Sequence, residues 1–274
     1  MLEELNRRAN VITRRYKDKL VFIYDDHRWL LNILFKLYKE EQRVYDIVSF
    51  DAHDDAVDCP HCSEMLKQIG VDGLIDATEK QFGAFVDYDI RSDDGNWLRV
   101  ACELGLIRHS CTIGNRYNSN IINLHNEYKS ENGDLHFLFE MSGDLWYEIG
   151  NRGKLGDSCR AKECDKLRKF FDSGELYYHC IGEMSPFILD FDLDYFTMET
   201  SKSGVMAWTP RVWEREYVDC AENKRFTQCL MSKASIITIC REPDFCGSIG
   251  DSNKILEMLD MYLFEGNLGA KPPF

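Results

Sequence analysis

Residues 44–55 read VYDIVSFDAHDD, an apolar run that passes directly into acidic residues and a histidine. A short run of this kind, rich in β-branched and aromatic residues, is typical of a buried strand. The same pattern stands earlier in the chain, where LVFIY at 20–24 leads into Asp25, Asp26 and His27. Both strands are therefore predicted to deliver polar side chains at their carboxyl ends.

A helix is predicted between these two strands. From Trp29 to about Glu41, apolar residues recur at the spacing of one helix face. Strand, helix and strand in this order favour a parallel sheet. A further strand is predicted at 136–139, and further helices at 96–105 and at about 252–264.

Two later segments repeat the change from an apolar strand to acidic residues. PFIL at 186–189 is followed by DFDLD at 190–194, and SIITIC at 235–240 is followed by REP at 241–243. Open parallel sheets bind ligands beyond the carboxyl ends of their strands. Four such strands therefore predict that their polar side chains converge on one site.

These elements predict an α/β fold with three layers, α/β/α, around a mainly parallel sheet. The length of 274 residues is compatible with a single catalytic domain over residues 1–274. A polar segment with several glycines and charges at about 142–175 is expected to form an excursion from that domain.

The charge balance bears on the partners of the protein. A formal net charge of −14 disfavours binding to phosphate backbones, which needs clustered Lys and Arg. The first residues are polar and charged, and no later run approaches the roughly 18 apolar residues of a membrane-spanning helix. We therefore expect a cytoplasmic protein with no nucleic acid and no membrane partner. Its eleven scattered cysteines are expected to be mostly reduced.

The polar residues after the strands form a set suited to metal ions. If the chain stays extended there, Asp51, His53 and Asp55 face one side, because strand side chains alternate. Asp192 and Asp194 have the same two-residue spacing. Such a concentration of negative charge requires cations. Oxygen ligands with a few imidazoles favour two Mn²⁺ ions over thiophilic metals, with zinc as an alternative.

Each member of this set also has a structural interpretation. An Asp after a strand commonly caps a helix or stabilises a turn, and a single His is commonly structural. The joint occurrence of Asp-Ala-His-x-Asp and Asp-x-Asp after apolar strands favours the metal site. His27, which follows the first strand, would be a further ligand.

Two segments resemble the signature segments of the arginase and agmatinase ureohydrolases, namely DAHDD at 51–55 and FDLD at 191–194. Four longer segments are similar to those of the peptide arginases, enzymes that modify ribosomally made peptides. They are YDDH at 24–27, SFDAHDD at 49–55, DFDLDYF at 190–196 and REPDFC at 241–246. The resemblance implies an arginase/deacetylase-like fold and a metal-dependent hydrolase.

The resemblance also implies roles for individual residues. One Mn²⁺ would be held by His27, Asp51, Asp55 and Asp192, and the other by His53, Asp51, Asp192 and Asp194. Asp51 and Asp192 would bridge the two ions, and the catalytic set would be Asp51, His53, Asp192 and Glu242. Hydroxide formed between the ions would attack the guanidinium carbon of an arginine residue in a precursor peptide, giving ornithine and urea.

Three further residues are interpreted through the same resemblance. Glu242 resembles the family's guanidinium-binding acid, and an ordinary salt bridge with a neighbouring Arg or Lys, such as the adjacent Arg241, is the alternative. Asn96 is a candidate substrate contact, although its default interpretation is a helix N-cap. Asp190 stands where arginases commonly carry serine, and it is expected either to orient ligands or to bond to backbone groups.

Some segments of arginases are not recognisable in this chain. Their Gly-Gly-Asp-His-Ser type segment reads YDDHR at 24–28, and no His occurs at 62–108 to act as their proton shuttle. The general acid is therefore unassigned. Segments that would clamp the carboxylate and ammonium groups of free arginine are also not recognisable, which favours an arginine held in a peptide.

Other interpretations stay open. A mononuclear zinc deacylase would keep an Asp-x-His and a later Asp around one ion, whereas a non-catalytic module would bind arginine-containing peptides without turnover. Cys59 and Cys62, in CPHC, resemble the dithiol of thiol oxidoreductases, although an incidental pair is favoured. The pattern predicts no particular oligomeric state.

Overall fold

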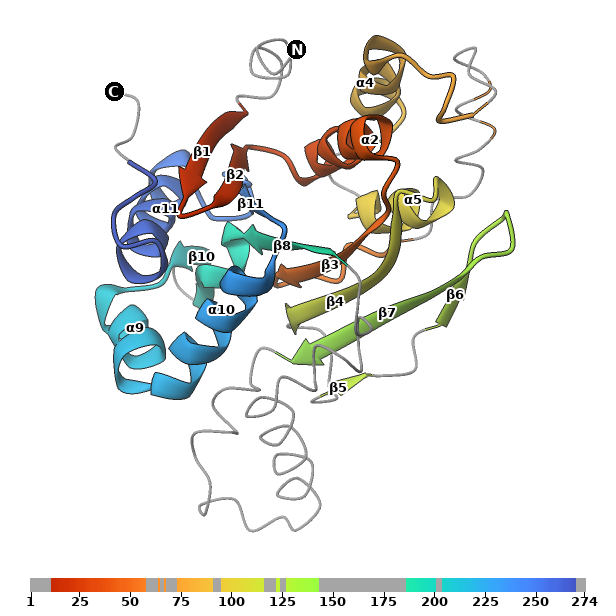
Figure 1. The fold of residues 1–274 in the computed structure, drawn as a ribbon. Helices are drawn as coiled ribbons and strands as arrows, with labels where there is room; N and C mark the ends of the chain where they lie inside the picture. Colours follow the sequence, from red (N-terminus) through yellow and green to blue (C-terminus); the bar gives the residue numbers. More distant parts are fainter. Residues whose placement is uncertain are drawn as a thin grey trace.

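The computed structural model describes residues 11–57, 64, 67, 73–90, 95–115, 122–123, 127–142, 186–200 and 204–269. These residues form a nine-stranded sheet with helices packed against both faces (Figure 1). A separate two-stranded sheet joins β9 (Thr197–Thr200) to β10 (Gly204–Ala207). The predicted three-layer α/β fold with a mainly parallel sheet is therefore confirmed.

Six neighbouring strands of the large sheet are parallel. In sheet order they are β2 (Lys19–Tyr24), β11 (Ile236–Cys240), β8 (Phe187–Asp192), β3 (Tyr45–Phe50), β4 (Ile107–Asn115) and β7 (Leu135–Ser142). The outer pairings are antiparallel. They join β1 (Ile12–Tyr16) to β2, and β5 (Ile122–Asn123) and β6 (Glu127–Lys129) to β7. The residues that follow β2, β11, β8 and β3 therefore meet at one edge of the sheet.

Different helices cover the two faces of the sheet. One face packs against α2 (Leu30–Glu41), α4 (Glu79–Tyr88) and α5 (Trp97–Glu103), at the upper right of Figure 1. The other packs against α9 (Pro210–Glu214), α10 (Ala221–Lys233) and α11 (Ile249–Leu263), at the left of Figure 1. A π-helical turn at Arg215–Asp219 follows α9 directly.

The pleat of β8 sends alternate side chains to opposite faces of the sheet. Leu189 and Phe191 pack among α9, α10 and α11, whereas Ile188 packs toward α2 and α5. Asp190 and Asp192 continue the series of Ile188, so both carboxylates lie on the face that α2 and α5 cover. Two acidic side chains of one strand are thereby directed to the same layer.

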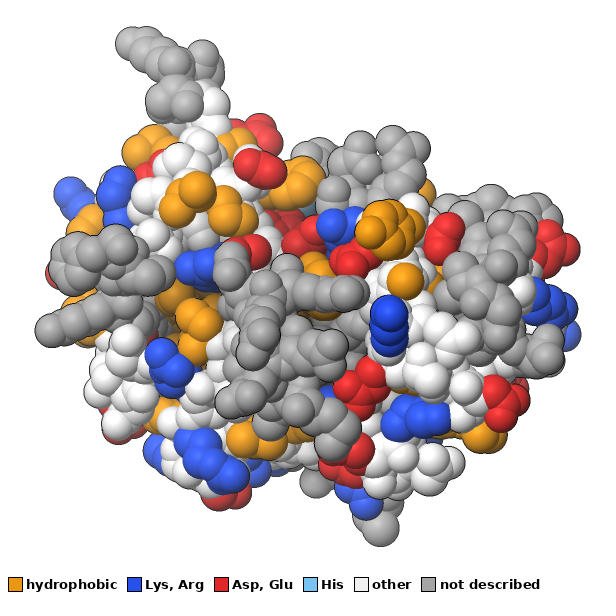
Figure 2. All heavy atoms as spheres, turned by 90° about the horizontal axis from the view of Figure 1, so that it is seen from above, with side chains coloured by type: hydrophobic (Ala, Val, Ile, Leu, Met, Phe, Trp, Pro, Cys, Tyr) orange, Lys and Arg blue, Asp and Glu red, His pale blue; other side chains and the backbone are white. Residues whose placement is uncertain are grey.

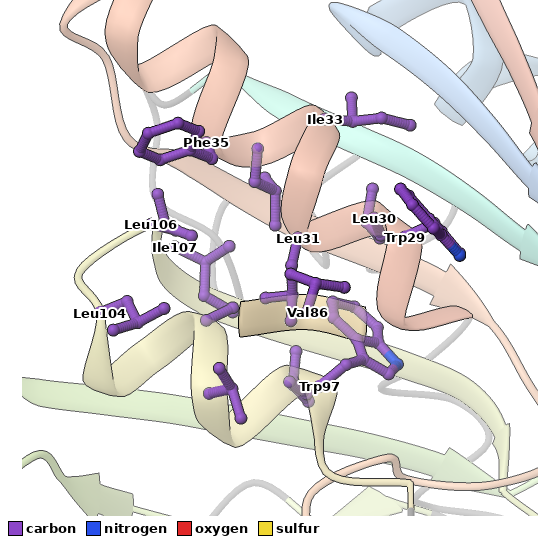
Figure 3. Close-up of a cluster of buried hydrophobic side chains, with 14 of the residues drawn as sticks. Trp29, Leu30, Leu31, Ile33, Phe35, Val86, Trp97, Leu104, Leu106 and Ile107 are labelled. Carbon is purple, nitrogen blue, oxygen red and sulfur yellow. The ribbon is translucent and has the colours of Figure 1, made fainter. Parts of the chain in front are cut away.

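The packing of α2, α4 and α5 fixes the backbone beside these carboxylates. Leu30 and Leu31 of α2 are fully buried, and they share one apolar cluster with Val86 of α4 and Trp97 of α5 (Figure 3). A short 3-10 turn at His27–Trp29 connects β2 to α2. Because α2 follows β2 directly, this cluster holds the segment that carries His27 against the sheet.

The surface has mixed charge on the face that Figure 2 draws. Lys and Arg side chains are interspersed there with Asp and Glu and with hydrophobic side chains. Among the described residues, none of the helices has the length and apolar character needed to cross a lipid bilayer.

The predicted strands at 20–24, 44–50, 136–139, 186–189 and 235–240 correspond to β2, β3, β7, β8 and β11, and the predicted helices correspond to α2, α5 and α11. The sequence pattern does not identify β4, because its residues IRHSCTIGN lack a regular alternation. It also does not identify β1, α4, α9 or α10. The single domain over 1–274 stays a prediction, and the excursion at about 142–175 lies, beyond Ser142, outside the described residues.

Candidate metal centre

The candidate site lies at the carboxyl ends of four adjacent strands. His27 follows β2, Asp51 follows β3, Asp192 ends β8 and Glu242 follows β11. These strands are neighbours in the sheet, in the order β2, β11, β8 and β3. The topology therefore brings together four segments that are far apart in the sequence, as the strand-then-acid pattern predicts.

Three carboxylates surround one nitrogen of His27. Its Nδ1 atom lies 2.8 Å from Asp55 Oδ2, 2.9 Å from Asp192 Oδ2 and 3.8 Å from Asp51 Oδ2. The four ligand atoms all lie within 4.8 Å of one another. This group has the composition predicted for one of the two metal ions.

The contacts and the burial of His27 indicate whether a cation fits this group. Its Nε2 atom lies 2.8 Å from Asp190 Oδ2 in a hydrogen bond, and its buried Nδ1 atom has no partner in hydrogen-bond geometry. Burial lowers the pKa of His27, but Asp190 and the surrounding carboxylates outweigh burial and hold that pKa well above its usual range. A proton on Nδ1, or a metal ion in its place, is needed to offset the negative charge, so the group fits a divalent cation.

A second group adjoins the first through Asp51. Asp51, His53 and Asp194 offer ligand atoms that lie within 4.8 Å of one another. His53 Nδ1 lies 2.7 Å from Asp194 Oδ2 and 3.9 Å from Asp51 Oδ1. Asp51 belongs to both groups, as a bridging ligand would. Asp192 belongs to the first group and lies outside the second, so its role as a second bridge stays a prediction.

Two similar turns orient the aspartates. Asp51 Oδ1 accepts a hydrogen bond from the backbone N–H of His53 at 2.7 Å, and Asp192 Oδ1 accepts one from that of Asp194 at 3.0 Å. In each case the second oxygen, Oδ2, faces His27. The Ala52 N–H donates to Asp194 Oδ1 at 3.3 Å and links the two turns. Local hydrogen bonds thus fix which carboxylate oxygens point into the site.

Residues 51–55 do not stay extended, so the condition under which Asp51, His53 and Asp55 would face one side is not met. The chain turns after β3, and Asp55 has a left-handed backbone with φ of 48°. The start of α5 holds it there, because the Leu98 N–H donates to the Asp55 carbonyl at 3.2 Å and the Trp97 indole N–H donates to Asp55 Oδ2 at 2.5 Å. The Trp97 ring also packs on His27 with centroids 4.6 Å apart. The sequence does not reveal this role of Trp97, since nothing in the local pattern links Trp97 to Asp55.

Asn96 does not cap α5 with its side chain, so its default interpretation is wrong. Asn96 stands at the N-cap position of α5 without a side-chain hydrogen bond to the helix. Its Oδ1 atom is buried and has no hydrogen-bond partner among the described residues. Contact with substrate stays a prediction for this residue.

Glu242 lies beside the first group. Its Oε1 accepts a hydrogen bond from the backbone N–H of His27 at 3.3 Å, and its carboxylate lies within 4.8 Å of ligand atoms of His27, Asp192 and Cys240. The adjacent Arg241 pairs with Asp25. The alternative of an Arg241–Glu242 salt bridge is therefore not supported.

Cys240 is a neighbour that the sequence analysis missed. Its thiol belongs to the same group as His27, Asp192 and Glu242. The only available signal was its place at the end of a predicted strand. Cys59 and Cys62, the candidate dithiol, lie outside the described residues.

Burial, reinforced by the crowding of carboxylates, controls protonation in the site. Burial, reinforced by Asp55, Asp192 and Asp194, raises the pKa of Asp51 well above its usual range. Burial and the Asp194 charge raise the pKa of Asp192 to about 7. Burial and the Asp192 charge also raise the pKa of Glu242 well above its usual range. The site must hold either protons or added cations at neutral pH.

The stability of the metal-free protein should fall as pH rises from about 4 to about 7. Because the folded-state pKa of Asp192 is about 7 and the unfolded-state value is lower, the unfolded chain loses its proton first. The stabilisation that comes from the raised pKa of Asp192 is complete below the unfolded-state pKa, and it is lost as pH rises toward the folded-state pKa. Thermal unfolding in the presence of a chelator at several pH values measures how the stability changes with pH. Asp192→Asn should make this pH dependence less steep, and a metal-free protein that becomes more stable over this range would contradict the prediction.

Replacing Trp97 by Phe should weaken metal binding at the His27 group about 10-fold. The substitution keeps an aromatic ring but removes the indole N–H that donates to Asp55, and groups that orient ligands typically contribute on this scale. Titration with Mn²⁺ measures the effect. Trp208→Phe is the matched control, because the Trp208 indole N–H donates to the Thr197 carbonyl at 2.9 Å instead. Equal metal affinity in Trp97→Phe and the unmodified protein would exclude this role.

The chain shares a distant structural likeness with a solved protein. It is similar to proclavaminate amidino hydrolase from Streptomyces clavuligerus, with 13% sequence identity and a TM-score of 0.45. The likeness covers 92% of this chain, which spans 65% of the length of that protein chain. No family model matches the sequence, and no curated protein matches it.

Proposed function

We propose that this protein is a manganese-dependent hydrolase that cleaves the guanidinium group of an arginine residue within a peptide, leaving ornithine and releasing urea. The observation that carries the proposal is the convergence of Asp51, Asp55 and Asp192 on His27 Nδ1, with Glu242 adjoining. A buried set of this kind is unfavourable without cations. The proposal assigns it two divalent ions and a cationic substrate.

The ligands favour manganese. His27, Asp51, Asp55 and Asp192 would hold one ion, and Asp51, His53 and Asp194, with Asp192 as the predicted second bridge, would hold the other. Carboxylate oxygens outnumber imidazoles in both groups, a composition that suits Mn²⁺ better than thiophilic metals. Two such ions, when bound, would acidify water and make hydroxide available near neutral pH for attack on the guanidinium carbon.

Glu242 would bind the guanidinium group. Its carboxylate is positioned by the His27 N–H and is not neutralised by its neighbour Arg241, which pairs with Asp25. A planar guanidinium can donate two parallel N–H bonds to one carboxylate, and this fixes the orientation of the carbon that reacts. Placed beside the first metal group, Glu242 would hold that carbon next to Asp192 and His27.

A peptide substrate is supported by the partly open side of the site. The side chain of His53 is 35% exposed, and Phe245, which is 42% exposed, lies with its ring centroid 6.0 Å from that of His53. An exposed aromatic ring beside an accessible ligand can contact the peptide around the reacting arginine. The proposal places this reaction in the cytoplasm, on a ribosomally made precursor peptide.

One observation supports a second candidate function. Cys240 contributes a thiol near His27 and Asp192, and thiol ligands favour zinc. A zinc deacylase would hold a single ion, whereas the proposed hydrolase holds two. The number and identity of the bound ions distinguish the two functions.

The deciding experiment supplies metal-stripped protein with Mn²⁺ or Zn²⁺ and measures urea release from free arginine and from arginine-containing peptides. We expect urea from peptides with Mn²⁺ and two bound ions per chain. Asp51→Ala should abolish both metal binding and turnover, because Asp51 belongs to both ligand groups. Deacylation with a single zinc ion would favour the second candidate, and no urea with any metal would exclude the proposed reaction.

Replacing Glu242 by Gln should lower kcat/KM for the peptide about 10- to 100-fold, because it removes a charged partner from the guanidinium. Both metal ions should still bind, since Glu242 is outside the predicted ligand set. Glu103→Gln is the control for loss of a glutamate carboxylate elsewhere, because Glu103 is buried and accepts a hydrogen bond from the Glu131 N–H instead. Unchanged kinetics in Glu242→Gln would remove Glu242 from the substrate site.

A further inference from the structure

We propose that Asp190 is a positioning residue that sets the tautomer of His27 and thereby makes His27 Nδ1 a metal ligand. This inference rests on the proposed function, because it concerns the ligands of the same site. Asp190 belongs to neither ligand group. It contacts the Nε2 atom of His27, whose Nδ1 atom faces Asp55 and Asp192, and so it acts through the imidazole ring.

Asp190 occupies the centre of the parallel sheet. It lies on β8 with its side chain fully buried, and its strand neighbours in register are Ser49 on β3 and Thr238 on β11. A carboxylate buried in this way is costly unless hydrogen bonds compensate for lost water. The surroundings of Asp190 supply four such bonds.

The four donors divide evenly between the two carboxylate oxygens. Tyr24 Oη and Thr238 Oγ1 donate to Oδ1 at 3.2 and 2.5 Å. Ser49 Oγ donates to Oδ2 at 3.0 Å, and His27 Nε2 lies 2.8 Å from the same oxygen. Three hydroxyl groups donate to this carboxylate, which acts as the acceptor in each bond, so His27 is the fourth donor and carries a proton on Nε2.

The position of this proton determines whether Nδ1 can bind a metal ion. With hydrogen on Nε2, the neutral ring presents the lone pair of Nδ1 to the point where Asp51, Asp55 and Asp192 converge. In the opposite tautomer, an N–H bond would occupy that point and exclude a metal ion. Donation to a carboxylate also increases the basicity of the ligating nitrogen.

The variant Asp190→Asn reverses this arrangement with almost no change in shape. Because Tyr24 and Thr238 donate to Oδ1, the amide should keep its oxygen there and direct its NH₂ group toward His27. Nε2 must then accept a hydrogen bond, and the ring proton moves to Nδ1. We expect the Mn²⁺ affinity of the His27 group to fall about 10- to 100-fold, while the group of Asp51, His53 and Asp194 changes much less.

Titration of the protein with Mn²⁺, followed by the electron paramagnetic resonance signal of free Mn²⁺, resolves the two sites. Asp46→Asn is the matched control for loss of a buried charge. Asp46 is buried on the same sheet but pairs with Arg108 at its opposite edge, so this variant should lose stability and keep both metal affinities. A generic effect of removing a buried carboxylate would appear in both variants, whereas the positioning role appears only in Asp190→Asn.

A measurement on the unmodified protein does not depend on how the variant folds. Nitrogen NMR of the Zn²⁺-loaded protein, with zinc as the diamagnetic probe, should show His27 protonated at Nε2 and bound to metal at Nδ1. The opposite tautomer, or unchanged affinity at both sites in Asp190→Asn, overturns this inference and leaves the proposed function in place. Unmodified protein that binds no divalent ion overturns both.

Discussion

Repulsion among carboxylates gathered around His27 is the constraint on which the rest of the structure depends. Asp51, Asp55 and Asp192 surround one ring nitrogen, and Asp190 contacts the other. Burial removes the water that would screen these charges, and each carboxylate opposes ionisation of the next. Left to themselves, such side chains would turn toward solvent. The fold must therefore hold each one in place and leave room for cations between them.

Strands, turns and close packing together hold these carboxylates in place. Parallel strands bring the aspartates to one edge, and turns at residues 51–53 and 192–194 use one oxygen of each carboxylate and leave the other for the site. Close packing then prevents the turns from relaxing. At Gly114, whose φ is 115°, an added Cβ would lie 2.3 Å from the Tyr195 ring and 2.9 Å from the Asp51 carbonyl. Only glycine allows β4 to approach the backbone that carries Asp51 so closely.

The sequence predicts those parts of the site that are local. Each change from an apolar run to acidic residues lies within about ten residues, so β2, β3, β8 and β11 and the ligands after them are recognisable. The sequence does not specify the features that depend on tertiary contacts. The mixed polarity of β4 hides a strand that is buried by its neighbours, and the left-handed turn at Asp55 depends on Trp97, which lies forty-two residues further along. Asn96 is a second case in which the sequence is misleading. Asn is a favoured N-cap residue, but Asn96 makes no side-chain hydrogen bond to the helix that it precedes.

Charge balance links the metal centre to the choice of substrate. The carboxylates of the two ligand groups and of the adjoining Glu242, namely Asp51, Asp55, Asp192, Asp194 and Glu242, contribute five negative charges when ionised, and two divalent ions would supply four positive charges. The carboxylate of Asp190 is stabilised separately, by its four hydrogen bonds. One negative charge is left before any water ionises, and it is assigned to Glu242, the carboxylate outside the predicted ligand set. Under the proposed function a guanidinium would neutralise it, whereas a neutral acyl group would leave it uncompensated beside Asp192, where burial and that charge already oppose its ionisation. The same repulsion that calls for metal ions therefore also favours a cationic substrate over the neutral one of a deacylase.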